Sequence, residues 1–198
     1  MTVSVISMSP SRQMSPSLAP RLLSLCGVIR DTLPLVRAAI ASTAVLRIAM
    51  DEQAPPVEAD PAAMQRVLLE LVLNASQAIR QPHGVIEIGV VGMTGSNGHS
   101  HPFVRLTVAD NGIGMDGASV GNLRQQLVEA DPSHGAGLGL RIVHRAVSAH
   151  GGRLLIDSQP GNGTTVRVDL PAVSQRSGIR GSGAFEGEDR SWVRRRPT

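Results

Sequence analysis

The residues best suited to chemistry lie in three short segments of this 198-residue sequence. Glu70 and Asn74 are four residues apart in 66-RVLLELVLNASQAI-79, so on a helix they share one face. Asp110 ends an apolar run and opens 110-DNGIGM-115, and 135-GAGLGL-140 opens another apolar segment. An amide oxygen suits Mg²⁺, and glycines in front of a helix expose backbone amides that suit phosphate oxygens. These residues could therefore bind a cation and phosphate.

Each segment also has an ordinary structural interpretation. Glu70 can pair with Arg66 one helical turn earlier, and Asp-Asn-Gly is a common turn sequence. The stretch 112-GIGMDG-117 also fits the glycine pattern of a dinucleotide-binding unit, with Asp131 about twenty residues further on. Asp110 immediately before the glycines, and the lack of a long predicted helix directly after them, argue against that alternative.

The elements that must position these segments follow from the periodicity of the apolar residues. Asp60 followed by Pro61 predicts the start of a helix over 61–81, which is apolar around most of its circumference except for one polar stripe. Residues 55–61 read as an extended connector, and two antiparallel hairpins are expected. The other predicted elements are helices at 20–42, interrupted or restarted near Pro34, at 119–128 and at 138–152, and strands at 45–51, 85–92, 103–110, 153–159 and 164–171.

Composition excludes several kinds of function. All 19 basic residues are Arg, which excludes a P-loop, a kinase that needs a strand lysine, and Schiff-base catalysis. Residues 1–170 are neutral, with 13 Arg and 13 acidic residues, and aromatic residues are 2% of the chain, so we expect no nucleic-acid binding. No apolar run approaches the roughly 20 residues of a membrane span. With the single cysteine Cys26, this predicts a cytoplasmic chain that makes no contact with membranes.

In this order the three segments resemble the ATP-binding fold shared by gyrase, the heat-shock chaperone of that superfamily, MutL and sensor histidine kinases. The stretch 151-GGRLLIDSQPGNGTTVRVDLP-171 is similar to the C-terminal hairpin of the histidine-kinase branch. The resemblance covers residues 20–171 and implies an α+β fold, a two-layer α/β sandwich of the Bergerat type, with three helices covering one face of a mixed, mostly antiparallel sheet. Residues 1–19 would be a flexible leader or the end of a dimerisation hairpin, and 172–198 a disordered tail rich in Gly, Ser and Arg.

The resemblance implies ATP and Mg²⁺ as ligands and gives each segment a role. Asp110 would accept a hydrogen bond from the exocyclic amine of adenine, a group that guanine does not offer there. Asn74 would bind Mg²⁺, and Glu70 would be catalytic beside it. The other nucleotide-binding residues would be Gly112 and Gly114 at the base, Gly135, Gly137, Leu138 and Gly139 at the phosphates, and Thr164 in the adenine pocket.

The function implied is that of the catalytic domain of a two-component sensor histidine kinase. It would transfer the γ-phosphoryl group of ATP to a histidine on a separate dimerisation domain, and indirectly serve a response regulator. No histidine in this sequence has the context of such an acceptor, and residues 115–134, which correspond to the lid of the family, lack the Phe-containing motif often found there. Two alternatives stay open: a stand-alone ATPase in which Glu70 activates water, and a serine kinase or partner-binding regulator of the anti-sigma type.

Overall fold

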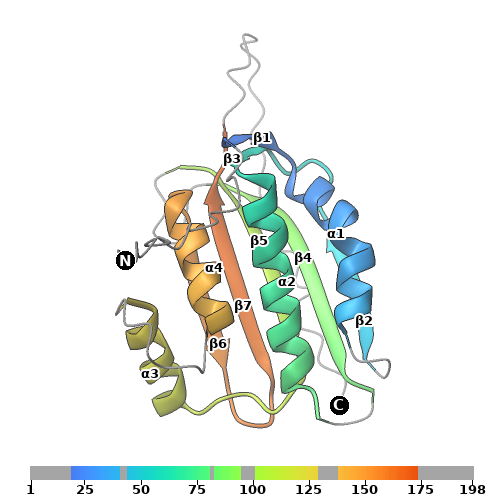
Figure 1. The fold of residues 1–198 in the computed structure, drawn as a ribbon, viewed down its shortest axis with the longest axis vertical. Helices are drawn as coiled ribbons and strands as arrows, with labels where there is room; N and C mark the ends of the chain where they lie inside the picture. The colour runs from blue at the N-terminus through green and yellow to red at the C-terminus, as the bar shows by residue number, and fades with distance from the viewer. Residues whose placement is uncertain (1–18, 41–43, 81–82, 95–100, 129–137, 174–198) are drawn as a thin grey trace, which may run out of the picture.

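The computed structural model describes residues 19–40, 44–80, 83–94, 101–128 and 138–173. Figure 1 shows α1, α2 and α4 as one layer over a single face of the main sheet, with α3 at the side of β6, which confirms the predicted two-layer sandwich. In the described ranges, no helix has the length and apolar character needed to cross a membrane.

The elements in chain order are β1 (Arg21–Leu23), α1 (Leu25–Ala39), β2 (Val45–Met50), β3 (Val57–Ala59), α2 (Pro61–Ala78), β4 (Val85–Met93), β5 (Phe103–Asp110), α3 (Gly117–Val128), α4 (Leu138–Ala149), β6 (Arg153–Ser158) and β7 (Thr164–Pro171).

The main sheet has five strands in the order β2-β4-β5-β7-β6. Only β2 and β4 are parallel, so the sheet is mixed and mostly antiparallel, and both predicted hairpins are confirmed. The register sets Asp110 of β5 opposite Thr164 of β7 and, on the other side, opposite Ile86 of β4. The end of the central strand β5 is therefore held from both sides.

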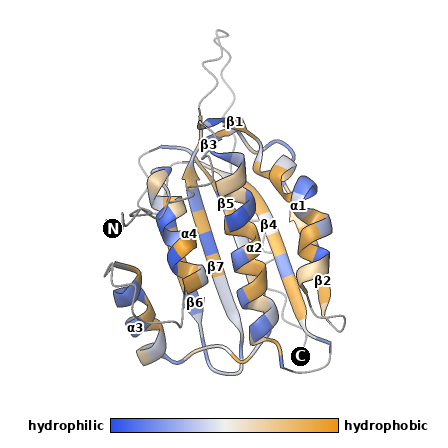
Figure 2. Ribbon diagram, viewed as in Figure 1, coloured by the Kyte–Doolittle hydropathy of each residue, from blue (hydrophilic) through white to orange (hydrophobic). Residues whose placement is uncertain are grey.

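The core lies between the sheet and the helical layer. Along β5, Val104, Leu106 and Val108 are buried against the helices and alternate with residues on the opposite face, as a half-covered strand requires. Figure 2 shows the same alternation of apolar and polar residues along β7. The central helix α2 contributes Val67 and Val72, both fully buried. Burial on this scale fixes the position of α2 and with it the polar residues on its remaining stripe.

The start of α2 agrees with its sequence. Asp60 caps the helix, its carboxylate accepting a hydrogen bond from the Ala62 N–H at 2.9 Å, and Pro61 occupies the first turn. In contrast, the interruption predicted near Pro34 is wrong, because α1 runs through this residue without a break. A proline inside a helix costs about 3 kcal/mol. The buried face of α1, which includes the fully buried Thr32 and Val36, outweighs that cost.

Two short strands and one helix start were not predicted. The strands β1 and β3 pair in a separate two-stranded sheet, and β3 lies within the predicted connector 55–61. Helix α3 begins at Gly117 because the Asp116 carboxylate accepts a hydrogen bond from the Ser119 N–H at 2.7 Å, a contact that also lowers the pKa of Asp116. The chain contacts the domain beyond residue 171, the predicted end of the domain. The Val173 N–H donates a hydrogen bond to the Pro56 carbonyl at 2.9 Å.

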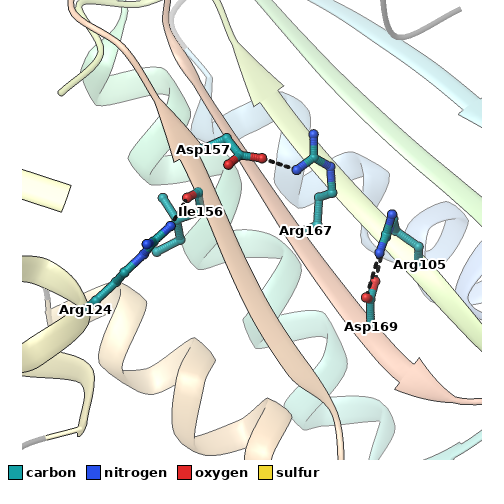
Figure 3. A network of polar contacts seen from close by, with 6 residues as sticks. All are labelled: Arg105, Arg124, Ile156, Asp157, Arg167 and Asp169. Atoms are coloured by element: carbon teal, nitrogen blue, oxygen red, sulfur yellow. Dashed lines mark hydrogen bonds and ion pairs between the residues drawn. The ribbon is translucent and has the colours of Figure 1, made fainter. Parts of the chain in front are cut away.

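Ion pairs cross the strands of the main sheet. Arg105 of β5 donates twice to Asp169 of β7, both at 2.7 Å, and Asp169 has a side chain with no exposed surface. Figure 3 shows this pair beside the pair of Arg167 with Asp157, which joins β7 to β6. The Arg105–Asp169 pair, with two hydrogen bonds to a fully buried carboxylate, favours the observed register between β5 and β7.

Candidate functional site

The carboxylate of Asp110 is held by two backbone amides. Its Oδ1 atom accepts a hydrogen bond from the Gly112 N–H at 2.8 Å and another from the Thr164 N–H at 3.3 Å. No donor within the described part of the chain reaches Oδ2. Burial raises the pKa of Asp110 above the usual value of an aspartate, and the two amides oppose this shift only in part. Asp110 is thus fixed through Oδ1, and Oδ2 is the oxygen that a ligand could contact.

Ser158, which sequence reasoning missed, anchors the same corner. It ends β6 opposite Thr164, and its Oγ accepts a hydrogen bond from the Met115 N–H at 2.8 Å and donates one to the Gly163 carbonyl at 3.1 Å. The Thr164 hydroxyl lies 2.9 Å from the same Oγ. A small hydroxyl residue at the end of the strand before the turn 160–163 was the available signal in the sequence.

The glycines after Asp110 lie against other parts of the backbone. A Cβ on Gly112 would be 2.5 Å from the Ala78 carbonyl oxygen at the end of α2. Gly114 has φ +64°, and a Cβ there would be 1.9 Å from the Gln159 carbonyl oxygen. Both positions therefore need glycine for the loop to pack. Contact of this backbone with a purine base stays a prediction.

At the other end of the site, Glu70 and Asn74 of α2 face the first turn of α4. A Cβ on Gly139 would be 2.8 Å from Glu70 Oε2 and 3.3 Å from Asn74 Nδ2. The Asn74 Nδ2 atom is buried and has no hydrogen-bond partner among the described residues. A buried polar group left unpaired costs about 1–3 kcal/mol, so Asn74 is a candidate for contact with a ligand. The unpaired NH₂ group is a donor and fits a phosphate oxygen, whereas Asn74 Oδ1, 3.4 Å from the same Cβ position, is the atom that could bind Mg²⁺.

Glu70 also makes the ordinary contact that its spacing allows. Its Oε1 atom lies 3.8 Å from Nε of Arg66, whose side chain is 63% exposed. An exposed pair at this distance contributes little to stability. The second carboxylate oxygen, Oε2, is the one that faces Gly139, so the pair with Arg66 leaves Glu70 available to the site.

Part of the predicted phosphate segment lies outside the described residues. Gly135 and Gly137 belong to that part, as does Asp131 of the dinucleotide-binding alternative. Leu138 opens α4, and its side chain is 60% exposed. The structure therefore brings Glu70 and Asn74 to Gly139, and Asp110 to Thr164, as two separate clusters.

The dinucleotide-binding alternative fails for a different reason from the one expected. A helix of 12 residues does follow directly, since α3 begins at Gly117, so that argument against it was wrong. However, β5 is antiparallel to both of its neighbours, β4 and β7. A dinucleotide-binding unit needs parallel strands joined by a helical crossover.

Comparison with known proteins identifies the family. Residues 59–174, more than half of the chain, match the family described as histidine kinase-, DNA gyrase B- and HSP90-like ATPase. The chain belongs to this family. The resemblance inferred from the three segments is confirmed, and the chain is an ATP-binding catalytic domain of the kind found in sensor histidine kinases.

The relatives in this ATPase family are much longer proteins. Sensor histidine kinase ZraS of Escherichia coli strain K12 is 33% identical over 165 residues, which cover 83% of this chain and 34% of ZraS. Signal transduction histidine-protein kinase AtoS of the same strain is 32% identical over 155 residues, 75% of this chain and 23% of AtoS. The chain thus spans about a third of ZraS and less of AtoS.

Solved structures show the same fold. The mycobacterial sensor histidine kinase MprB has a TM-score of 0.59 at 25% identity, covering 78% of this chain and 98% of the MprB chain. Full-length ShkA in complex with AMPPNP has a TM-score of 0.63 at 24% identity, covering 81% of this chain and 33% of that chain. These likenesses confirm the predicted fold class of this ATPase domain.

Two glycines in the turn between β6 and β7 provide a matched test of how the backbone packs around Asp110. Gly161 has φ +73° and Gly163 φ +76°, but a Cβ on Gly163 would be 1.9 Å from the Asp110 carbonyl oxygen, whereas a Cβ on Gly161 meets nothing within 4 Å. We expect Gly161→Ala to lower the free energy of unfolding by about 1 kcal/mol, the cost of the backbone angle. Gly163→Ala should cost about 3 kcal/mol and also weaken ATP binding, because Asp110 must move.

Urea denaturation and calorimetric titration with ATP measure both effects for the two variants. Equal losses of stability and unchanged ATP affinity in both would show that the backbone packing around Asp110 does not depend on the close approach of Gly163.

Proposed function

We propose that this domain binds ATP with Mg²⁺ between its two polar clusters and transfers the γ-phosphoryl group to a histidine of a dimerisation domain, in the same or another chain. A response regulator would receive the phosphoryl group afterwards. One observation carries the proposal. Among the described residues, Asp110 Oδ2 has no donor at one end of the site, and at the other end the unpaired Asn74 Nδ2 faces Gly139 beside Glu70.

The proposed role of Asp110 is selection of adenine. Its free Oδ2 atom would accept a hydrogen bond from the exocyclic amine of the base, while Oδ1 remains held by the backbone. Guanine carries a carbonyl oxygen at the corresponding position, which would repel an ionised carboxylate. Gly112 and Gly114 would lie beside the base, and Thr164, tied to Ser158, would complete this pocket.

The proposed role of Asn74 is to hold Mg²⁺ together with the phosphates. Among the described residues, no group of three or more His, Cys, Asp or Glu side chains forms a site that could hold a metal ion. Mg²⁺ commonly keeps several waters and shares its remaining positions between one or two protein oxygens and phosphate oxygens, which suits a single amide ligand. When bound, the ion would neutralise charge on the phosphates. The helix start at Leu138 and Gly139, with Gly135 and Gly137, would favour the phosphates through backbone amides.

Glu70 supports a second candidate function. Its Oε2 atom faces Gly139, next to Asn74, so it can orient either an incoming histidine or a water molecule. With water as the acceptor, the domain would be a hydrolytic ATPase. The sensor histidine kinases among the relatives favour histidine as the acceptor. The cytoplasm, where ATP is available, is the proposed location of the reaction.

A phosphotransfer assay separates these functions. The chain is incubated with Mg²⁺ and γ-labelled ATP, with and without a supplied dimerisation domain that carries the acceptor histidine. Acid-labile label on the added domain, lost in its His→Gln variant, is the expected result. Release of inorganic phosphate without the acceptor, abolished by Glu70→Gln, would instead establish the hydrolytic ATPase. If neither label nor free phosphate appears, the proposed reaction is wrong.

A further inference from the structure

A cavity of about 390 Å³ lies between α3, α4 and the edge strand β6. Its apolar lining includes Leu127 of α3 and Leu154 and Leu155 of β6, and Leu155 is 41% exposed. His144 lines it from α4. His144 is five residues after Gly139, which places the two about 140° apart around the helix. The cavity therefore opens on a different side of α4 from the side that faces Glu70 and Asn74.

The edge of the sheet at this cavity is already partly occupied. Arg124 of α3 donates a hydrogen bond from Nη2 to the Ile156 carbonyl at 2.9 Å, as Figure 3 shows. A strand added to the edge of β6 would have to displace this guanidinium group. The cavity is better suited to receive a side chain than to extend the sheet.

The charges around the cavity are mostly positive. Arg141 and Arg145 lie three residues before and one after His144, so all three share one face of α4. Within the described ranges, neither arginine forms an ion pair. Arg124 donates to a neutral carbonyl, and Asp157, the acidic residue of the lining, is paired with Arg167. Among the described residues, Arg124 at the cavity and Arg141 and Arg145 on the same face of α4 as His144 are thus three guanidinium groups without a paired carboxylate.

We propose that this surface binds an acidic segment of a partner protein, which inserts one apolar side chain into the cavity. Charge complementarity selects the acidic character, and the leucine lining selects the apolar side chain. A protein segment fits better than a small acid, because Arg141 and Arg145 extend the positive charge over more than one turn of α4. The proposal does not depend on the nucleotide chemistry. The residues that define this basic face are Arg124, Leu127, Arg141, His144, Arg145 and Leu155.

The test uses the full chain and a synthetic amphipathic peptide that is rich in Glu and carries one Leu. Methyl NMR should show shifts at Leu127, Leu154 and Leu155 on addition of the peptide. Replacing the Leu by Ala, or the Glu residues by Lys, should weaken binding at least about tenfold. The double variant Arg141→Glu/Arg145→Glu should show the same loss. Arg37→Glu, a single charge reversal at an exposed site on α1, should show none.

The proposal is overturned if the peptide does not bind, if the shifts lie away from the basic face, or if the double variant and Arg37→Glu bind equally. Binding of succinate as tight as that of the peptide would also overturn it, in favour of a small acidic ligand. ATP titration of the same variants distinguishes the two proposals. If the double variant still binds ATP but no longer binds the peptide, the effect belongs to the basic face. If the unchanged chain does not bind ATP, only the proposed kinase function is contradicted.

Discussion

Asp110→Asn is expected to weaken ATP binding at least about 100-fold, which corresponds to about 3 kcal/mol, while the domain stays folded. The reason lies in the two carboxylate oxygens. Oδ1 accepts both backbone hydrogen bonds, and an asparagine oxygen can keep both. The amide NH₂ group then takes the place of Oδ2 and presents a donor to the exocyclic amine of adenine, which is itself a donor. GTP affinity should not fall in parallel, so the preference for ATP over GTP should narrow.

The stability of the Asp110→Asn variant is its internal control. Burial raises the pKa of Asp110, so the folded protein holds that proton more tightly than the unfolded chain does. The ionised carboxylate therefore reduces the free energy of unfolding at pH values above its folded pKa, and the cost is relieved as pH falls through that value. Removing the charge should leave stability at neutral pH unchanged or slightly higher. Calorimetric titration with ATP and GTP and urea denaturation measure these effects; undiminished ATP affinity would refute the adenine assignment.

Asn74→Ala is expected to remove the Mg²⁺-dependent part of ATP binding and to slow phosphotransfer at least about 100-fold. The fold should tolerate the change, because the buried Asn74 Nδ2 atom has no partner among the described residues and its removal relieves that cost. Gln77→Ala is the matched control, since Gln77 is exposed and lies one helical turn further along α2.

ATP titrations with and without Mg²⁺ give the readout for Asn74→Ala. Asn74→Asp, which keeps an oxygen in place, should retain more of the Mg²⁺ dependence than Asn74→Ala. If Mg²⁺ strengthens ATP binding equally in the alanine variant and in the unchanged chain, the cation is held by other groups.

The sequence predicted correctly those features that depend on the residues of a single helix or strand. The cap at Asp60, the apolar circumference of α2 and the polar stripe with Glu70 and Asn74 all belong to one helix, and all three are confirmed. Asp110 was placed at a strand end for the same reason, since an apolar run stops there. Their joint action on a nucleotide stays a prediction, because no hydrogen bond or ion pair among the described residues joins the two clusters.

Contacts between elements were the part that the sequence did not reveal. Ser158 bonds to Met115 and Gly163 only because β6 and β7 pair in one register, and a one-residue change in that register would turn its side chain to the other face. Pro34 shows the opposite effect. Proline alone favours an interruption of the helix, but burial of the apolar face of α1 outweighs this local preference. The strands β1 and β3, with three residues each, are too short to show alternation.

An amide NMR titration of the full chain with Mg²⁺ and ATP tests the central claim most directly. Gly112 and Thr164 at the base end and Gly139 at the phosphate end should shift together, with one common affinity that is lost in Asp110→Asn. Shifts confined to one end, or to the basic face of α3, α4 and β6, would contradict a nucleotide bound between Asp110 and Asn74.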